Sequence, residues 1–218
     1  CGQADDCCAG HCSAGLCGAP LCAPDDVPVT LADGIVWPIG PVVHGAYVYI
    51  ASYDEDGAVY RVRRDGAGAE RWIDLVWPHD IATDAERVYV TTDAGVVAIP
   101  HDDPDAAEVL SSTFGGAGVG LTATRVVWAE YFGKAVRAVD KDGTGGVTLA
   151  DLDASPFRLQ VRGQRVVFTA HGLYELSLDN PTTSLVEPAP VRSFAIADDG
   201  ALWWSRNQGG SHEVVSET

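Results

Sequence analysis

Short runs of β-branched and aromatic residues recur along the chain at nearly even spacing. In each run two or three such residues precede a small residue, and the five runs are 48–52, 88–92, 126–130, 166–170 and 202–206. Successive runs start roughly 40 residues apart, a period typical of proteins built from repeated units. Because such side chains fit a pleated, buried strand, the pattern predicts five copies of one β-rich unit.

The residues on either side of each run repeat as well. A short apolar run precedes it, and a strand with one wet face follows it, as in 59–63, where arginines alternate with apolar residues. Turn sequences such as Asp65-Gly66 and Asp142-Gly143 come next, and they favour the positive φ of a tight hairpin. A fourth short strand, such as 70–73, completes the unit. Four antiparallel strands in about 40 residues are typical of one blade of a β-propeller.

The two ends of the repeated region match each other. The last unit ends at Thr218 after three strands, whereas residues 29–33 have the same sequence as the fourth strand at 147–151. We therefore predict an all-β, five-bladed β-propeller over residues 27–218, in which the N-terminal strand completes the C-terminal blade and closes the ring. Closure would remove the free strand edges that invite aggregation. The alternative is a piece of a six- or seven-bladed ring.

The repeated strands resemble a known group of propellers. The segments Tyr49-Ile50-Ala51-Ser52, Tyr89-Val90-Thr91-Thr92 and Trp203-Trp204-Ser205-Arg206 are similar to degenerate copies of the YWTD repeat of lipoprotein-receptor propellers and of uncharacterised propellers of bacterial surface proteins. The closing Asp of that repeat is replaced in all five units, by Ser52, Thr92, Glu130, Ala170 and Arg206. The resemblance implies a rigid extracellular scaffold that binds a ligand, and it does not imply an enzyme.

All the cysteines lie at the start of the chain. They are Cys1, Cys7, Cys8, Cys12, Cys17 and Cys22. A segment this short cannot fold on apolar burial alone, so an even number of cysteines predicts three disulfides, whose pairing the spacing leaves open. Zinc is the alternative, with His11 as a further ligand, but the paired C-x2-C knuckles typical of zinc sites are missing. We predict a cysteine-rich disulfide module and linker at residues 1–26.

The cysteine-rich segment also bears on where the protein works. The stretch from Cys1 to Cys17 resembles the small knottin-like modules with a vicinal cysteine pair that occur in secreted toxins and bacterial surface proteins. A second interpretation makes Cys1 the lipid-anchored first residue of a bacterial lipoprotein. Either interpretation places the protein in an oxidising compartment, secreted or in the cell envelope, whether extracellular or periplasmic.

The net charge and the lack of known catalytic motifs limit the classes of function that fit the sequence. The formal net charge is −17, which argues against nucleic acid and anionic membranes as partners because the field of the protein repels phosphate. No apolar run approaches the ~20 residues that a membrane-spanning helix needs. The sequence contains no G-x-S-x-G, H-E-x-x-H or P-loop motif. We predict a monomeric, non-enzymatic binding scaffold for a protein or carbohydrate ligand.

The loops before the first strand and after the second strand of each unit should emerge at one end, around the mouth of the central channel. Aromatic and charged residues on these loops are the types that dominate binding energy. The candidate binding residues are Trp37, Tyr53, Trp77, His79, Asp80, Glu130, Tyr131, His171, Arg206 and Asn207. The competing interpretation is that Trp37, Trp77, Phe114 and Phe157 pack between blades.

Two further hypotheses concern chemistry at the same end. An enzyme, a propeller lyase or hydrolase, would use His79, Asp80, His171 or Glu130 as acid and base. No cofactor is expected, although the acidic cluster Asp54, Glu55 and Asp56 could bind calcium instead of forming a solvated turn.

Overall fold

The computed structural model describes residues 12–13, 16–17, 30–66, 68–208 and 211–217. Strands β1 (Cys12–Ser13) and β2 (Leu16–Cys17) pair antiparallel, with Cys12 opposite Cys17. The other four cysteines and all cysteine side chains lie outside the described residues. The three disulfides, the module at 1–26 and the lipid anchor at Cys1 therefore stay predictions.

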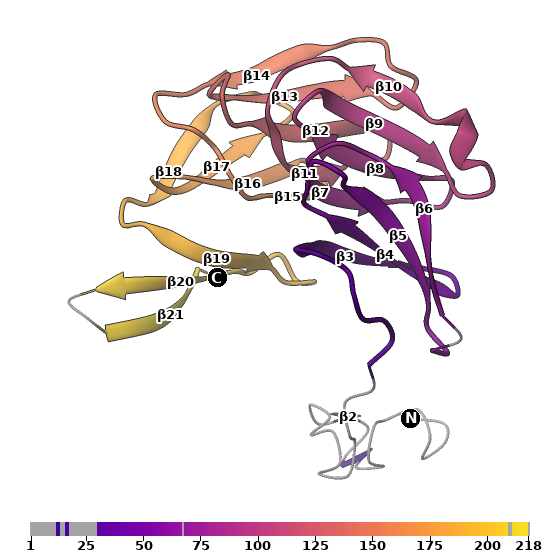
Figure 1. Cartoon of the computed structure of the whole chain (residues 1–218). Coiled ribbons are helices and arrows are strands. Elements are labelled where there is room, and N and C mark those ends of the chain that lie inside the picture. The colour runs from indigo at the N-terminus through magenta and orange to yellow at the C-terminus, as the bar shows by residue number, and fades with distance from the viewer. Residues whose placement is uncertain (1–11, 14–15, 18–29, 67, 209–210, 218) are drawn as a thin grey trace.

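Residues 38–217 form five antiparallel sheets whose strands follow one another in chain order (Figure 1). The first sheet contains β3 (Pro38–His44), β4 (Tyr47–Ser52), β5 (Ala58–Arg63) and β6 (Ala69–Asp74). The second contains β7 (Pro78–Thr83), β8 (Arg87–Thr92), β9 (Gly95–Pro100) and β10 (Glu108–Ser111). The third contains β11 (Gly116–Leu121), β12 (Arg125–Glu130), β13 (Ala135–Asp140) and β14 (Val147–Asp151).

The fourth sheet contains β15 (Leu159–Arg162), β16 (Arg165–Ala170), β17 (Gly172–Ser177) and β18 (Thr183–Glu187). The fifth has three strands, β19 (Val191–Ile196), β20 (Leu202–Gln208) and β21 (Ser211–Glu217). Among the described residues the helical part is a single 3₁₀ turn, η2 (Pro104–Ala106). The all-β prediction and the repeat of four strands are confirmed.

The core lies between sheets rather than within them. Each of four buried clusters joins one face of a sheet to the facing side of the next sheet along the chain. Representative pairs are Tyr49 with Val88, Tyr89 with Trp128, Val127 with Phe168, and Val167 with Trp204. Burying one such side chain stabilises the fold by ~1.5–3 kcal/mol. Both faces of the inner sheets must therefore be apolar, which is why the second strand of each unit reads as a continuous apolar run.

The prediction that an N-terminal strand completes the last blade and closes the ring is wrong. Thr30, Leu31 and Ala32 are in no strand, and β21 pairs with β20 alone among the described strands. Residues 30–35 instead line a cavity with Val48, Ile50 and Val62 on the open face of the first sheet. Among the described residues no sheet precedes the first one, and residues 30–35 lie on this face rather than along β21.

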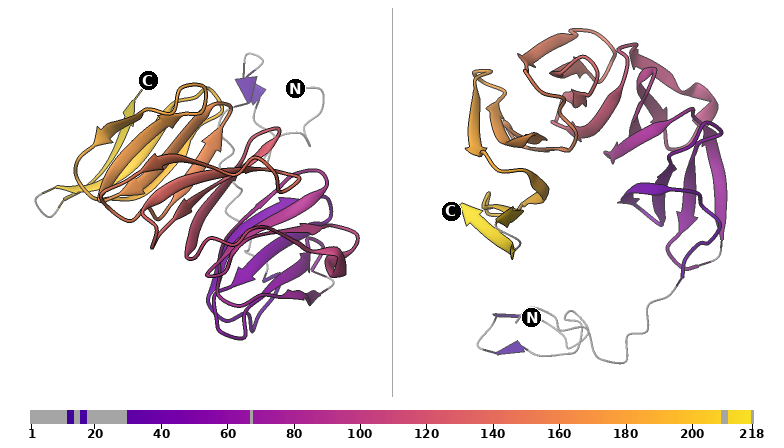
Figure 2. Two further views of the ribbon diagram at one scale, coloured as in Figure 1. Left: turned by 90° about the horizontal axis from the view of Figure 1, so that it is seen from above. Right: turned by 60° about the vertical axis from the view of Figure 1, so that its left-hand side comes forward.

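The five sheets consequently follow an open arc, with the gap between the sheet of β19–β21 and the sheet of β3–β6 (Figure 2). Trp203 stands at the register position of Tyr89 and Val127, which are buried between sheets. It is 45% exposed, because no further sheet of the described residues covers the fifth. The described residues thus form five sheets, and these sheets do not close into a five-bladed ring.

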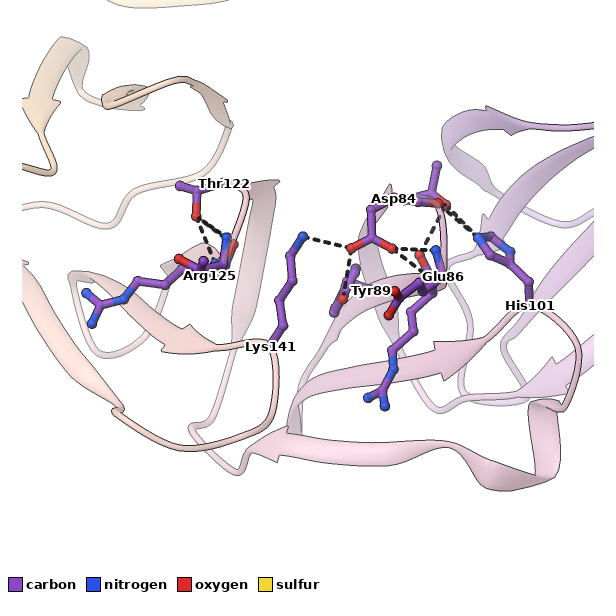
Figure 3. Close-up of polar contacts among 10 residues, drawn as sticks. Asp84, Glu86, Tyr89, His101, Thr122, Arg125 and Lys141 are labelled. Atoms are coloured by element: carbon purple, nitrogen blue, oxygen red, sulfur yellow. Dashed lines mark hydrogen bonds and ion pairs between the residues drawn. The ribbon is translucent and has the colours of Figure 1, made fainter.

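Polar contacts join neighbouring sheets near the turns that connect the first strand of a sheet to its second strand (Figure 3). Asp84 accepts hydrogen bonds from Lys141 Nζ of the third sheet (2.8 Å) and from the Tyr89 hydroxyl (3.0 Å). Burial alone would raise the pKa of Asp84, but Lys141 and the N–H groups of Glu86 and Arg87 outweigh it and lower that pKa to about 2.

Candidate functional site

Each of the five sheets has its first strand on the inner side of the arc, and equivalent positions on these strands can be aligned. The strand registers align Ile81, Val119, Leu159 and Phe194, which lie opposite equivalent residues of the second strands. The residue just before each of these, together with its counterpart in β3, forms one ring of positions: Gly40, Asp80, Gly118, Arg158 and Ser193. The preceding residue forms a second ring: Ile39, His79, Ala117, Phe157 and Arg192.

Two neighbouring cavities open onto these rings. The first, of about 470 Å³, is lined by residues of the fourth and fifth sheets, including His171 and Arg192. The second, also about 470 Å³, is lined by the first strands of the sheets and includes His79 and Asp80. Phe157 and Arg158 line both cavities. Volumes of this size suit a small ligand or a few side chains of a partner.

The two glycines of the inner ring allow the sheets to approach. Gly40 has a φ of +57°, and a Cβ there would lie 2.8 Å from the Asp80 carboxylate. A Cβ on Gly118 would lie 2.4 Å from the Leu159 nitrogen, so β11 and β15 can pack this closely only with glycine at that position. The Gly118 N–H donates to the Phe157 carbonyl at 2.8 Å, which joins the third and fourth sheets at the cavity wall.

Asp80 is the acid of the second cavity. Its carboxylate accepts a hydrogen bond from the Val119 N–H at 3.0 Å, so it links the second and third sheets. Burial raises the pKa of Asp80 to about 6, although the N–H groups of Val119 and Ile81 favour the ionised form. A buried carboxylate with a raised pKa inside a cavity is typical of functional sites, although structural networks produce the same shift.

His79 connects the cavity to an aromatic cluster at the rim. His79 Nε2 lies 2.8 Å from Asp93 Oδ1, and the two side chains are 20% and 33% exposed. The Tyr53 ring packs against both His79 and Trp77, with centroids 5.0 Å apart in each pair. Tyr53, Trp77, His79 and Asp80 were all predicted at the channel mouth, and the structure brings them together there.

A second aromatic cluster surrounds Phe157. The Phe114 and Phe132 rings stack at 5.0 Å, and Tyr131 lies between Phe132 and Phe157, at 5.2 and 6.3 Å. Tyr131 is 41% exposed and Phe157 55%. Trp37, Phe114 and Phe157 are mostly exposed, so the expectation that they pack between blades is wrong for these three, while Trp77 is half-buried.

The two arginines of the first cavity hold no carboxylate at ion-pair distance among the described residues, although the charge of Arg158 favours the ionised form of Asp80. The side chains of Arg158 and Arg192 form no ion pair and no hydrogen bond with the described part of the chain. The arginines bound to carboxylates are Arg61, Arg63, Arg71, Arg87, Arg125, Arg137, Arg162, Arg165 and Arg206. His171, in the tight turn between β16 and β17 with a φ of +63°, is exposed beside Arg192 in the lining of this cavity.

Three predicted binding residues have other roles or lie outside the described side chains. Glu130 is 4% exposed and its carboxylate holds Arg137 Nε at 2.5 Å, so it is a buried structural ion pair. Arg206 is held by Glu187 at 2.9 Å and by Glu213 at 3.0 Å. The backbone of Asn207 lies in β20, and its side chain is outside the described set.

The acidic cluster at 54–56 forms a turn. The Asp54 carbonyl accepts from the N–H groups of Gly57 (3.0 Å) and Trp77 (2.9 Å), and the Asp56 carbonyl accepts from Arg71 (2.7 Å). Within the residues that the structure describes, no group of three or more His, Cys, Asp or Glu side chains converges on one point. The calcium hypothesis therefore gains no support from these contacts.

Arg158, Arg192 and Asp93 were not among the predicted site residues. The repeat itself contains the signal for two of them, because Arg158 aligns with Asp80 and Arg192 with His79 once the registers are known. Asp93 follows the second strand directly, in the loop set that was predicted to reach the mouth.

Comparisons with known proteins define the class of fold. No protein-family model matches the chain, and neither does the sequence of any curated protein. A structure of a nidogen/laminin complex is similar with a TM-score of 0.67 at 16% identity, over 79% of this chain and 73% of that chain. Streptogramin B lyase is similar with a TM-score of 0.63 at 11% identity, over 83% of this chain and 68% of that one.

A protein of unknown function from Bacteroides thetaiotaomicron is also similar, with a TM-score of 0.62 at 11% identity, over 79% of this chain and 53% of that one. At these identities the likeness concerns the fold alone. The chain has a propeller-like β fold. Within the described residues, no helix is both long and apolar enough to cross a membrane.

Proposed function

We propose that this protein is a non-enzymatic extracellular scaffold that binds a ligand or partner protein on the face of the arc that the sequence predicted as the channel mouth. The observation that carries the proposal is the pair of cavities on the first strands, which share Phe157 and Arg158 and are bordered by exposed aromatic side chains. The nidogen/laminin neighbour supports a propeller that binds a protein. The clustered cysteines support secretion or the cell envelope.

The rim suits recognition because its aromatic side chains are anchored. Tyr53 is held between Trp77 and His79, and Tyr131 between Phe132 and Phe157, so little side-chain entropy is lost on binding. Their exposed edges offer apolar area together with a hydroxyl group. Such surfaces are enriched where proteins bind other proteins, and aromatic faces also accept the apolar side of a sugar ring.

The test is an array screen followed by alanine variants. A ligand found on protein and glycan arrays should bind the Trp77→Ala and Tyr131→Ala variants about tenfold more weakly, because each loses a central aromatic contact. The control is Trp203→Ala, which removes an exposed tryptophan of the fifth sheet. Binding that tolerates both rim variants and is lost in the control would place the binding surface on the fifth sheet.

A lyase or hydrolase is the second candidate, and two observations favour it. His79 and Asp93 form a close pair, and Asp80 with its raised pKa lies in the same cavity lining as His79. A base oriented by a carboxylate beside a proton donor suits general acid–base catalysis. Streptogramin B, the substrate named for one neighbour, is therefore a substrate to assay by mass spectrometry. Turnover that disappears in His79→Ala would favour the enzyme, and no turnover favours the scaffold.

A further inference from the structure

We propose that Arg158 and Arg192 form a subsite for a small organic anion, in which a carboxylate, sulfonate or phosphate group lies beside an aromatic or apolar portion of the same molecule. This inference rests on the proposed binding function and names the class of ligand. It follows from the two cavities, the ion pairs of the described residues and the exposure of Phe157.

The distribution of ion pairs is the first argument. With 31 acidic and 14 basic side chains, carboxylates outnumber cations about two to one. Nine arginines accordingly hold a carboxylate, and the guanidinium of Arg64 donates to the Gly45 carbonyl at 3.3 Å. Arg158 and Arg192 are the described arginines whose side chains have no such partner, and both line the same cavity.

The geometry of the cavity is the second argument. Arg158 directly precedes β15 and Arg192 lies in β19, so two consecutive sheets each position one guanidinium. A guanidinium presents a planar fork of donors that matches the two oxygens of a carboxylate or the oxygens of a sulfonate or phosphate. Two such forks in one cavity lining can therefore bind the oxygens of an anion from solution.

The local charge is the third argument. The titratable and charged residues that line the two cavities are His79, Asp80, Arg158, His171 and Arg192. Asp80 is the single acid among them, its carboxylate accepts the Val119 N–H, and its charge is partly balanced by Arg158, which leaves Arg192 without a nearby acid in either lining. The cavities are thus locally cationic within a protein of net charge −17, and low-dielectric walls focus such a local field on the ligand.

The exposed ring of Phe157 indicates that the part of the ligand next to its anionic group is aromatic or apolar. It lines both cavities, adjoins Arg158 in the chain and is 55% exposed. Pro190 and Val191 contribute further apolar surface to the cavity of Arg192. An anion attached to an aromatic ring could place its charge on the arginines and its ring on Phe157, whereas an inorganic anion would leave that surface exposed.

The test uses naphthalene-2-sulfonate and phenylacetate as anionic probes, with phenylacetamide as the neutral analogue. Affinity is measured by titration calorimetry and by the shifts of the arginine Nε–H signals in NMR spectra. We expect both anions to bind at least tenfold more tightly than phenylacetamide. Arg158→Gln and Arg192→Gln should each weaken anion binding about tenfold, because each removes a charge-assisted hydrogen bond.

Arg64→Gln is the matched control, since Arg64 is an exposed arginine without a carboxylate partner and away from both cavities. Equal losses in Arg64→Gln and the two cavity variants would mean unspecific attraction to charge and would overturn the proposal. Equal binding of phenylacetamide would overturn it as well. Thermal unfolding verifies that each variant is folded, and both Arg158 and Arg192 are exposed, so neither substitution should perturb the fold.

The outcome also separates this inference from the proposed function. If an array ligand is lost in Trp77→Ala but binds Arg158→Gln and Arg192→Gln normally, the scaffold proposal stands and the anion subsite fails. If neither an array ligand nor the anionic probes depend on any residue of the two cavities or the rim, both fail.

Discussion

Replacing Asp80 with asparagine should stabilise the protein above pH 6 and have little effect near pH 3. The pKa of Asp80 is raised by burial from 3.8 to about 6. Between these two values the folded state holds a proton that the unfolded state has released, so the free energy of unfolding falls as the pH rises. Above pH 6 the folded state keeps a buried, ionised carboxylate at a cost.

The size of the effect follows from the shift in pKa. About two pKa units at 1.36 kcal/mol each correspond to roughly 3 kcal/mol, an upper value for the cost of ionised Asp80. Asparagine is nearly isosteric, and its Oδ1 can still accept the hydrogen bond that Val119 N–H donates at 3.0 Å. Asp80→Asn removes the charge without leaving that N–H unpaired, so the variant should be more stable at pH 7.5, by roughly 1–3 kcal/mol.

Urea unfolding at pH 3, 4, 5, 6 and 7.5 measures the difference between Asp80→Asn and the original protein. The gain should grow through this range and level off above pH 6. Asp103→Asn, at an exposed aspartate next to η2, is the control and should change stability by a few tenths of a kcal/mol at every pH. An Asp80→Asn variant that is less stable at pH 7.5 would refute the reasoning, because ionised Asp80 would then be held favourably.

Three other substitutions test the fold. Asp84→Asn should cost about 1–2 kcal/mol at pH 7, because the lowered pKa of Asp84, about 2, reflects its contacts with Lys141 and backbone N–H groups; the difference in urea unfolding should shrink as the pH falls from 4 toward 2. Trp128→Ala should cost about 3–5 kcal/mol, measured by the same method, because Trp128 is 2% exposed between two sheets. Gly118→Ala should lower the unfolding temperature by several degrees, because its Cβ would collide with the backbone of Leu159; an unchanged value would mean that these sheets can move apart freely.

The sheets could be predicted because their signals are local. Alternation of apolar and polar residues sets each strand, and Asp-Gly turns set several hairpins, so the repeat is readable within about 40 residues. Closure of the ring could not be predicted in this way. Residues 29–33 have the sequence of a fourth strand, yet residues 30–35 line a cavity with Val48 and Ile50 of the first sheet, and which sheet such a segment joins depends on tertiary packing.

The sequence predicted where the candidate site lies but only some of the residues that form it. Loop position identified Tyr53, Trp77, His79 and Asp80 as neighbours at one end of the sheets. Glu130 was misjudged because its partner Arg137 lies on the adjacent strand, and only the register shows that they meet. That Arg158 and Arg192 hold no carboxylate emerges only after the other ten arginines have been assigned partners in space.

The most direct test of the account is a crystal structure of the protein grown with 4-bromobenzoate, with the bromine located by anomalous scattering. The account predicts a bromine peak against Phe157, in the cavities that it shares with Arg158, and carboxylate density facing that arginine or Arg192. Bromine bound instead on the exposed face of Trp203, with no density in either cavity, would contradict the assignment of the ligand site.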